Sequence, residues 1–283
     1  MSVYTLVPWY HELIARDSNA LATYLTGPFL AATHDLASTL ARHRTISGPR
    51  YAPGPHPRAE DPGLTNDLWL LYGFSRVNDA LLLLFQSTAR APGIARQEWA
   101  TAYRHYWTAL GFAPFGAGPY SPFYHEIVEV ADPDPGQSVP RIEAVRWPGL
   151  MFGDLLFARA GVRVRFPAGA VNRRTAEEST LYFAYQRLHR RTNDLSMGWG
   201  HNSQWRTRFH RCYTGRGRFH FNVDGNLDLG GNDRHPNAGL PLAERRALLV
   251  NRCFVRATPQ MEEEWWPWDD TLTVAHDTPL WRL

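Results

Sequence analysis

The sequence predicts an α+β fold, mainly helical over about residues 1–112, with mixed strands and helices and a β-hairpin over about residues 113–283. In the first part, apolar residues recur at three- and four-residue spacing, which is the period of an amphipathic helix. In the second part, short segments alternate apolar and polar residues, as half-buried strands do. Proline- and glycine-rich breakers are spread evenly along the chain, so we expect a single globular domain over residues 1–283.

Four helices are expected in the N-terminal part, over residues 10–25, 28–43, 64–87 and 95–110. The most apolar run, residues 68–85, is interrupted by Arg76, Asn78 and Asp79, so it predicts a buried helix and not a membrane span. Tyr72, Arg76 and Asp79 converge within that helix, where the burial of polar groups is costly. They predict either a substrate carboxylate bound by Tyr72 and Arg76, or a structural Arg76–Asp79 ion pair closed by the Tyr72 hydroxyl.

The segment FYHEIVEV, at residues 123–130, carries a second candidate group. His125 and Glu129 share a face on a strand and are i, i+4 neighbours on a helix, so both structures allow general base or metal-ligand chemistry. We therefore take His125 and Glu126 as candidate catalytic residues. The segment lacks the second histidine of the zinc-peptidase pattern HExxH, and a partly exposed structural strand is the favoured alternative.

Further along, RIEAVRW at 141–147 and VRVRF at 162–166 predict strands, and residues 175–192 predict a helix. That helix would open with a capping box between Thr175 and Glu178. Tyr182, Tyr185 and His189 would then form an aromatic stripe, from which His189 could ligate a metal or heme iron. Alternatively, His189 interacts with the dipole at the helix C-terminus.

The expected helix leads into a glycine-bounded loop, SMGWGHNSQW at residues 196–205. Glycines at 198 and 200 allow close approach of the backbone to a ligand. We take His201 as a candidate catalytic residue, and the candidate substrate-binding residues are Asn202, Gln204, Trp205 and Arg206. A helical histidine followed by such a loop is loosely similar to tryptophan 2,3-dioxygenase and other heme-dependent aromatic oxygenases. The resemblance covers about 20 residues, and it implies that His189 is the proximal ligand and that the loop covers the substrate.

Residues 205–223 predict a β-hairpin whose turn decides which side chains share a face. A two-residue turn at Gly215-Arg216 places Cys212 opposite Phe219 and His220 on the other face, so no metal cluster forms. A three-residue turn would instead gather the potential metal ligands His210, Cys212, His220 and Asp224 on one face. We expect the two-residue turn, since phenylalanines mark the core face.

Composition excludes several reaction classes. All 30 lysine-plus-arginine positions are arginine, so a lysine Schiff base, ordinary PLP catalysis and a Walker A lysine are excluded. Arginine forks bind carboxylates and phosphates in a planar geometry, which makes anionic ligands plausible, whereas a net charge of +3 is weak support for nucleic-acid binding. The two cysteines form no CxxC pair, and the N-terminus lacks a signal pattern, so we expect a cytoplasmic location.

Two functions remain open at this point. The first is a histidine-centred enzyme, a metal- or heme-dependent oxidoreductase for a small aromatic or amino-acid-like substrate, with His189 on the metal and Arg76 on a carboxylate. Its cofactor would be heme or a single transition metal. The second is a non-enzymatic protein, rich in arginine and tryptophan, that binds an anionic ligand or nucleic acid. A homodimer fits either function, and no membrane partner is expected.

Overall fold

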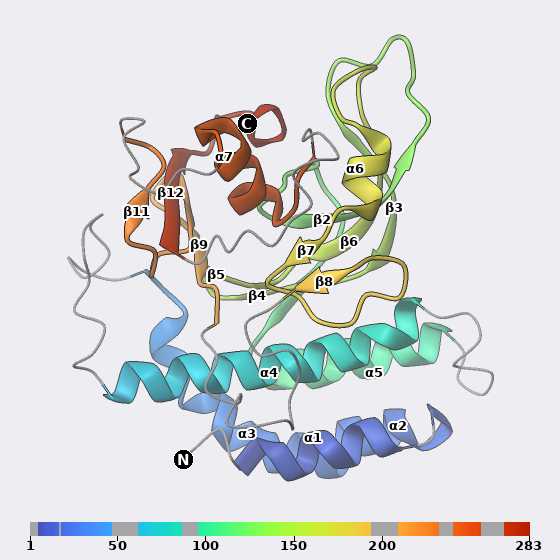
Figure 1. Ribbon diagram of the computed structural model, residues 1–283. Coiled ribbons are helices and arrows are strands. Elements are labelled where there is room, and N and C mark those ends of the chain that lie inside the picture. The colour runs from blue at the N-terminus through green and yellow to red at the C-terminus, as the bar shows by residue number, and fades with distance from the viewer. Residues whose placement is uncertain are drawn as a thin grey trace.

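The computed structural model describes residues 5–16, 18–46, 62–86, 96–193, 209–231, 240–255 and 269–283. It has the α+β architecture that the sequence predicts, with helices mainly in the N-terminal part and strands mainly in the C-terminal part. Figure 1 shows the arrangement in layers: α4 and α5 run between a layer formed by α1–α3 and the strands of the C-terminal part. The middle helices therefore have neighbours on two sides.

The N-terminal helices follow the predicted segments, except that the single helix predicted over residues 10–25 is divided after Ala15 into α1 and α2. They are α1 (Leu6–Ala15), α2 (Ser18–Tyr24), α3 (Leu30–Ser38), α4 (Pro62–Gln86) and α5 (Arg96–Ala109). A π-helical turn at Leu25–Phe29 contains Pro28 and joins α2 to α3. By length and composition Leu64–Gln86 could cross a membrane, but 72% of its most apolar window is buried inside the protein. The prediction of a buried helix over residues 68–85 is thus confirmed.

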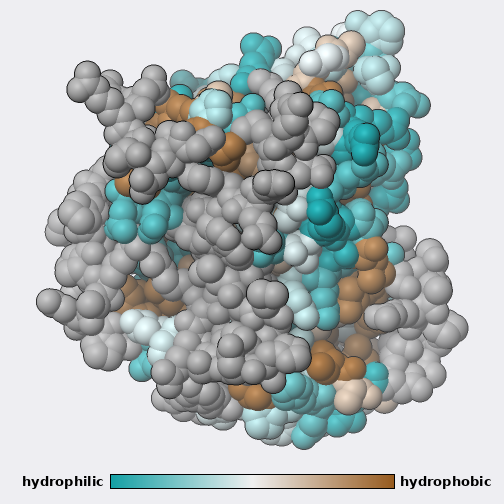
Figure 2. Space-filling model, viewed as in Figure 1, coloured by the Kyte–Doolittle hydropathy of each residue, from teal (hydrophilic) through white to brown (hydrophobic). Residues whose placement is uncertain are grey.

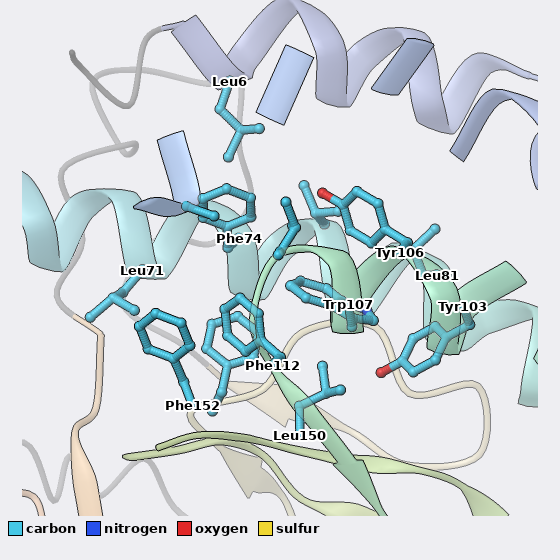
Figure 3. Packing of buried hydrophobic residues seen from close by; sticks show 14 of the residues in the cluster. Leu6, Leu71, Phe74, Leu81, Tyr103, Tyr106, Trp107, Phe112, Leu150 and Phe152 are labelled. Atoms are coloured by element: carbon cyan, nitrogen blue, oxygen red, sulfur yellow. The ribbon is translucent and has the colours of Figure 1, made fainter. Parts of the chain in front are cut away.

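Aromatic side chains fill the core between the helices and the sheet. Trp107 of α5 lies edge-on to Phe112, with ring centroids 4.9 Å apart, and 5.3 Å from the ring of Phe157. Figure 3 shows Trp107 and Tyr106 from α5 beside Phe74 from α4. Burial of side chains this large supplies most of the favourable free energy of packing.

Most strands belong to a seven-stranded sheet in the order β1-β4-β5-β9-β10-β12-β11. Its members are β1 (Ala113–Phe115), β4 (Gly149–Phe152), β5 (Leu155–Ala158), β9 (Cys212–Gly215), β10 (Arg218–Phe221), β11 (Leu227–Asp228) and β12 (Asp270–Ala275). All neighbouring pairs are antiparallel except β11 and β12. The helix α7 (Leu242–Asn251) contacts β12.

A second sheet has three strands in the order β2-β6-β3, with β2 (His125–Ala131), β3 (Arg141–Trp147) and β6 (Ala160–Arg165). The predicted strands at 141–147 and 162–166 are therefore confirmed, and FYHEIVEV contributes β2 from His125 onwards. In the view of Figure 2, hydrophilic side chains gather over the part of the molecule that holds α6 (Arg173–Glu178) and β3.

The predicted helix over residues 175–192 is wrong beyond its first turns. The cap is Asn172, whose side chain accepts a hydrogen bond from the Thr175 amide, and α6 ends at Glu178. The chain then forms β7 (Leu181–Tyr182) and β8 (Thr192–Asn193), which pair in parallel. Tertiary contacts outweigh the helical spacing here, because Arg187 and Arg190 reach buried partners that a helix would not allow them to reach.

The β9–β10 hairpin has a two-residue turn, but at Arg216-Gly217 instead of Gly215-Arg216. Both turn residues have positive φ, 52° and 74°, which is the geometry of a type I′ turn. Because the turn is shifted by one residue, each residue of β10 pairs with the β9 residue two positions further along than expected. The same side chains therefore share a face as with the expected turn. His220 accordingly lies opposite Tyr213 and on the other face from Cys212, as the two-residue turn predicts.

Candidate functional site

A pocket lies where α4 meets the strands β5 and β9. Its empty volume is about 680 Å³ with the open mouth included. Four arginines line the pocket together with aromatic and small side chains, and the complete lining is Tyr72, Ser75, Arg76, Asn78, Asp79, Leu156, Phe157, Ala158, Arg159, Phe183, Arg187, Phe209, His210, Cys212 and Arg252. Such a gathering of guanidinium groups inside a protein is costly unless anions compensate it.

Three of the four arginines belong to a chain of buried ion pairs that alternates in charge. Asp79 lies 3.0 Å from Arg76 and 2.8 Å from Arg187. Arg187 also contacts both oxygens of Glu126, at 2.9 and 3.3 Å, and Arg252 contacts Glu126 at 2.5 Å. Among the described residues, two carboxylates therefore hold three guanidinium groups together.

Arg159, the fourth arginine, has no carboxylate partner among the described residues. It lies between the end of β5 and the start of β6 and is 4% exposed. Among the described residues it donates to the carbonyl oxygens of Phe123 and Val250, each at 3.0 Å. Within the described residues its Nη1 has no hydrogen-bond partner. Burial and the nearby charge of Arg252 lower the pKa of Arg159 to about 9, so at neutral pH the group is still a cation.

The contacts of Arg159 differ from those of other buried arginines in the described residues. Arg211 forms a two-pronged pair with Asp224, at 2.8 and 2.6 Å, and Arg245 pairs with Asp270. Arg190, like Arg159, donates to uncharged oxygens. However, each of its three side-chain nitrogens has a partner, and Arg190 does not line the pocket. Among the described residues, Arg159 therefore combines a place on the pocket wall with uncharged partners and a buried nitrogen that has no hydrogen-bond partner.

The charges of Glu126 and Arg187 are fixed over the physiological pH range. Burial alone would raise the pKa of Glu126, but the charges of Arg187 and Arg252 outweigh it and lower that pKa to about 2. Burial lowers the pKa of Arg187, yet Glu126 and Asp79 more than reverse this effect and raise it. Glu126 is thus a permanent anion that holds arginines in place, which is a poor match to the general acid–base role expected from the sequence.

One wall of the pocket carries a histidine and a thiol. The ring of His210 stacks on Phe183, with centroids 3.8 Å apart, and its Nδ1 lies 3.4 Å from Cys212 Sγ. Burial raises the pKa of the Cys212 thiol, so the thiol is neutral at pH 7 and adds no negative charge to the site. His210 is the described histidine that lines this pocket.

Unusual backbone conformations concentrate around the same pocket. Phe183, Gln186 and Arg252 have positive φ values of 59°, 54° and 60° although none is glycine. Phe183 and Arg252 line the pocket, and Gln186 lies next to Arg187. Non-glycine residues adopt this conformation at a cost and often do so at binding sites, where the surrounding contacts enforce it.

The structure brings together some of the residues expected from the sequence. Tyr72 and Arg76 both line the pocket, where the Arg76 guanidinium carbon lies 4.7 Å from the centre of the Tyr72 ring. The structural alternative is also present, because Arg76 pairs with Asp79; Tyr72 contributes its ring face. Glu126 does not line the pocket, but it contacts two of the arginines that do, Arg187 and Arg252.

Other candidates lie elsewhere. His125 is 4% exposed, its Nδ1 lies 3.1 Å from the backbone nitrogen and oxygen of Ser121, and it is absent from the pocket lining. The strand around it is therefore more buried than expected, and a bulge between Ile127 and Glu129 shifts its register. His189 is exposed in a tight turn, not on a helical aromatic stripe. His201, Asn202, Gln204, Trp205 and Arg206 lie outside the described residues.

The sequence reasoning missed Arg159, Arg187 and Arg252 as members of one site. The available signal was weak but present, because Arg159 interrupts the apolar run LLFARAGV. No group of three or more histidine, cysteine, aspartate and glutamate side chains that could hold a metal ion occurs in the described part of the chain. An arginine-lined pocket in an α+β protein is what the geometry defines.

No protein-family model matches the chain, and neither the curated proteins nor the solved structures contain a significant match.

Proposed function

We propose that this protein binds a small anion in the arginine-lined pocket. The observation that carries the proposal is Arg159, a buried cation on the pocket wall whose described partners are all uncharged. Removing a guanidinium group from water costs several kcal/mol, and an anion bound beside it offsets that cost. This is the second of the two functions expected from the sequence, narrowed to a small ligand because the cationic groups are buried.

The pocket walls support the same proposal. Phe157 and Phe209 stack with their ring centroids 5.5 Å apart, and Phe183 lines the pocket as well. Apolar walls lower the local dielectric constant and thereby strengthen the attraction between arginine and an anion. They also offer a surface for an apolar or aromatic part of the ligand.

Isothermal titration calorimetry with inorganic phosphate and with benzoate tests the proposal. The diagnostic variant is Arg159→Met, which keeps much of the side-chain volume and removes the charge. A hydrogen bond to a charged group contributes about 1.5–3 kcal/mol, so this variant should bind roughly 10- to 150-fold more weakly.

The matched control is Arg174→Met, because Arg174 pairs with Glu178 on an exposed face of α6. It should bind like the unmodified protein, and Arg159→Lys should bind with intermediate affinity. Absence of binding by the unmodified protein, or equal binding by Arg159→Met and Arg174→Met, would contradict the proposal. Melting temperatures of all variants show whether a loss of binding merely reflects unfolding.

A catalytic role is the second candidate, and His210 is the residue that favours it. Its ring lines the pocket beside Cys212, in reach of an anion held by the arginines. The metal- or heme-dependent oxidoreductase expected from the sequence stays a prediction. An absorption spectrum and elemental analysis of protein from heme- and metal-replete cells test it: a Soret band or a stoichiometric metal would support it, and neither signal would count against it.

A further inference from the structure

We infer that His43 is a positioning residue, which as a neutral ring joins two walls of the anion pocket and loosens that joint when it gains a second proton. This inference rests on the proposed function and names a regulation of the same pocket. His43 lies in the short 3-10 helix η3 (Ala41–His43), and its side chain is 3% exposed. Its ring contacts Asp67 on α4 and Arg211 directly before β9.

The partners of the two ring nitrogens define the protonation state of His43. An arginine side chain only donates hydrogen bonds, so Arg211 Nη1 donates and His43 Nδ1 accepts, over 3.3 Å. His43 Nε2 lies 2.6 Å from a carboxylate oxygen of Asp67 and therefore carries the ring proton. Burial alone would raise the pKa of Asp67, but His43 and Arg42 outweigh burial and lower it, so this carboxylate is an anion that accepts the hydrogen bond. The contacts thus fit the neutral ring with its proton on Nε2.

Both partners of His43 belong to segments that form the pocket. Asp67 lies on α4, whose following turns line the pocket. Arg211 stands between His210 and Cys212, which both line the pocket. Neighbouring side chains of an extended segment point to opposite sides, so Arg211 reaches His43 while its two neighbours face the pocket. The two hydrogen bonds of His43 therefore connect α4 to the start of β9.

The groups on either side of this connection are fixed by further contacts. Next to His43, the carbonyl oxygen of Arg44 accepts a hydrogen bond from the Asp154 amide at 2.5 Å. Arg211 is held by its two-pronged pair with Asp224, at 2.8 and 2.6 Å. Since neither side is free to move away at no cost, a change in the ring of His43 acts on the position of β9 relative to α4.

A second proton would change this ring at the side of Arg211. The proton would sit on Nδ1 and point at the Arg211 guanidinium, so the hydrogen bond is lost and two cations face each other. The other charged and titratable groups that face His43 among the described residues are Arg42, Asp67 and Asp224. Histidine is the side chain whose charge changes most readily near neutral pH. Mild acid should therefore separate the two walls and weaken ligand binding.

Nitrogen-15 NMR of the histidine rings tests the assigned state of His43, because protonated and unprotonated ring nitrogens have well separated chemical shifts. The signals of His43 are those missing from the spectrum of His43→Gln. At pH 8 we expect a protonated Nε2 and an unprotonated Nδ1. A proton on Nδ1 at this pH overturns the inference, whether or not the pocket binds an anion.

Calorimetric titration with benzoate between about pH 8 and 5.5 tests the connection to the pocket, since a carboxylate of this kind stays ionised over the range. The affinity should fall at least about threefold around the pH at which NMR shows the second proton on His43, which corresponds to the loss of one hydrogen bond. His43→Gln gains no proton and lacks the ring, so it should bind weakly at both ends of the range and lack this step. A step caused by His210 or another pocket group would persist in His43→Gln.

The matched control is His34→Gln, because His34 and Asp35 form an exposed histidine–carboxylate pair on α3. It should keep both the affinity and the step. If the unmodified protein binds no anion, the proposed function fails and this inference fails with it. If benzoate binds with the same pH dependence to the unmodified protein and to His43→Gln, the proposed function holds and this inference is overturned. Should His43→Gln be unfolded, an affinity step in the unmodified protein away from the pH at which His43 is protonated overturns it as well.

Discussion

The ion-pair chain behind the pocket should be indispensable for stability, and Arg187→Met tests this. Arg187 is the centre of the chain, because its side chain is 4% exposed and contacts Asp79, Glu126 and the carbonyl oxygen of Tyr185. Removing it leaves two buried carboxylates with fewer cations. Breaking a buried ion pair in this way typically costs about 3–5 kcal/mol.

The geometry places the expected loss at the lower end of that range. Asp79 keeps Arg76 at 3.0 Å, and Glu126 keeps Arg252 at 2.5 Å, so neither carboxylate loses its last cation. We therefore expect the free energy of unfolding to fall by about 3 kcal/mol. For a protein of this size, the corresponding decrease in melting temperature is roughly 6–12 °C.

Urea denaturation followed by circular dichroism measures the loss, with Arg174→Met as the control. The Arg174–Glu178 pair is exposed, with side-chain exposures of 83% and 61%, and exposed pairs contribute little to stability. The control should unfold at the same urea concentration as the unmodified protein. If Arg187→Met loses no more stability than the control, the buried network does not have the role assigned to it.

Three further predictions concern the core and its pH dependence. The pKa of Glu126 is about 2 in the folded protein, so its contribution to stability should be complete above pH 4.5 and be lost as the pH falls towards 2. The free energy of unfolding of Glu126→Gln should therefore depend less steeply on pH in this window than that of the unmodified protein. Equal slopes for the two proteins would argue against Glu126 as a buried, ion-paired carboxylate. Burial lowers the pKa of His125, so the melting temperature should decrease as the pH falls below about 6.5. The variant His125→Gln should show a smaller decrease. The same pH profile of the melting temperature in both proteins would refute the role assigned to His125. At Gly161 an added Cβ would lie 2.1 Å from the Trp147 ring, so Gly161→Ala should destabilise the protein by about 1–3 kcal/mol. The control Gly27→Ala should not, because the space around Gly27 is open. Equal unfolding midpoints for the two variants would contradict this account of the packing.

The sequence predicted the helical part well because its signals are local. The apolar spacing in residues 64–87 depends only on neighbouring residues, and Arg76 and Asp79 stand out there because charged side chains interrupt an apolar helix. The structure places these two residues in an ion pair on the pocket wall, as the spacing suggested. Local patterns also identified the hairpin, with its turn shifted by one residue.

The complete site could not be predicted from the sequence because its residues are far apart in the chain. Arg159 and Val250 are 91 residues apart, and Arg252 and Glu126 are 126 residues apart, so only the fold brings them together. The helix expected over residues 175–192 failed for a related reason. Its aromatic spacing fits a helix, but the buried contacts of Arg187 decide the conformation, and that displaced His189 from its expected place.

Anomalous diffraction from crystals soaked in tungstate, a tetrahedral dianion, tests the central claim most directly. The account predicts a tungsten peak inside the pocket, with tungstate oxygens about 3 Å from the guanidinium group of Arg159. Crystals of Arg159→Met should lack this peak and keep any surface peaks. A pocket without tungsten in the unmodified protein, or a peak that persists in Arg159→Met, would contradict the claim that these arginines form an anion site.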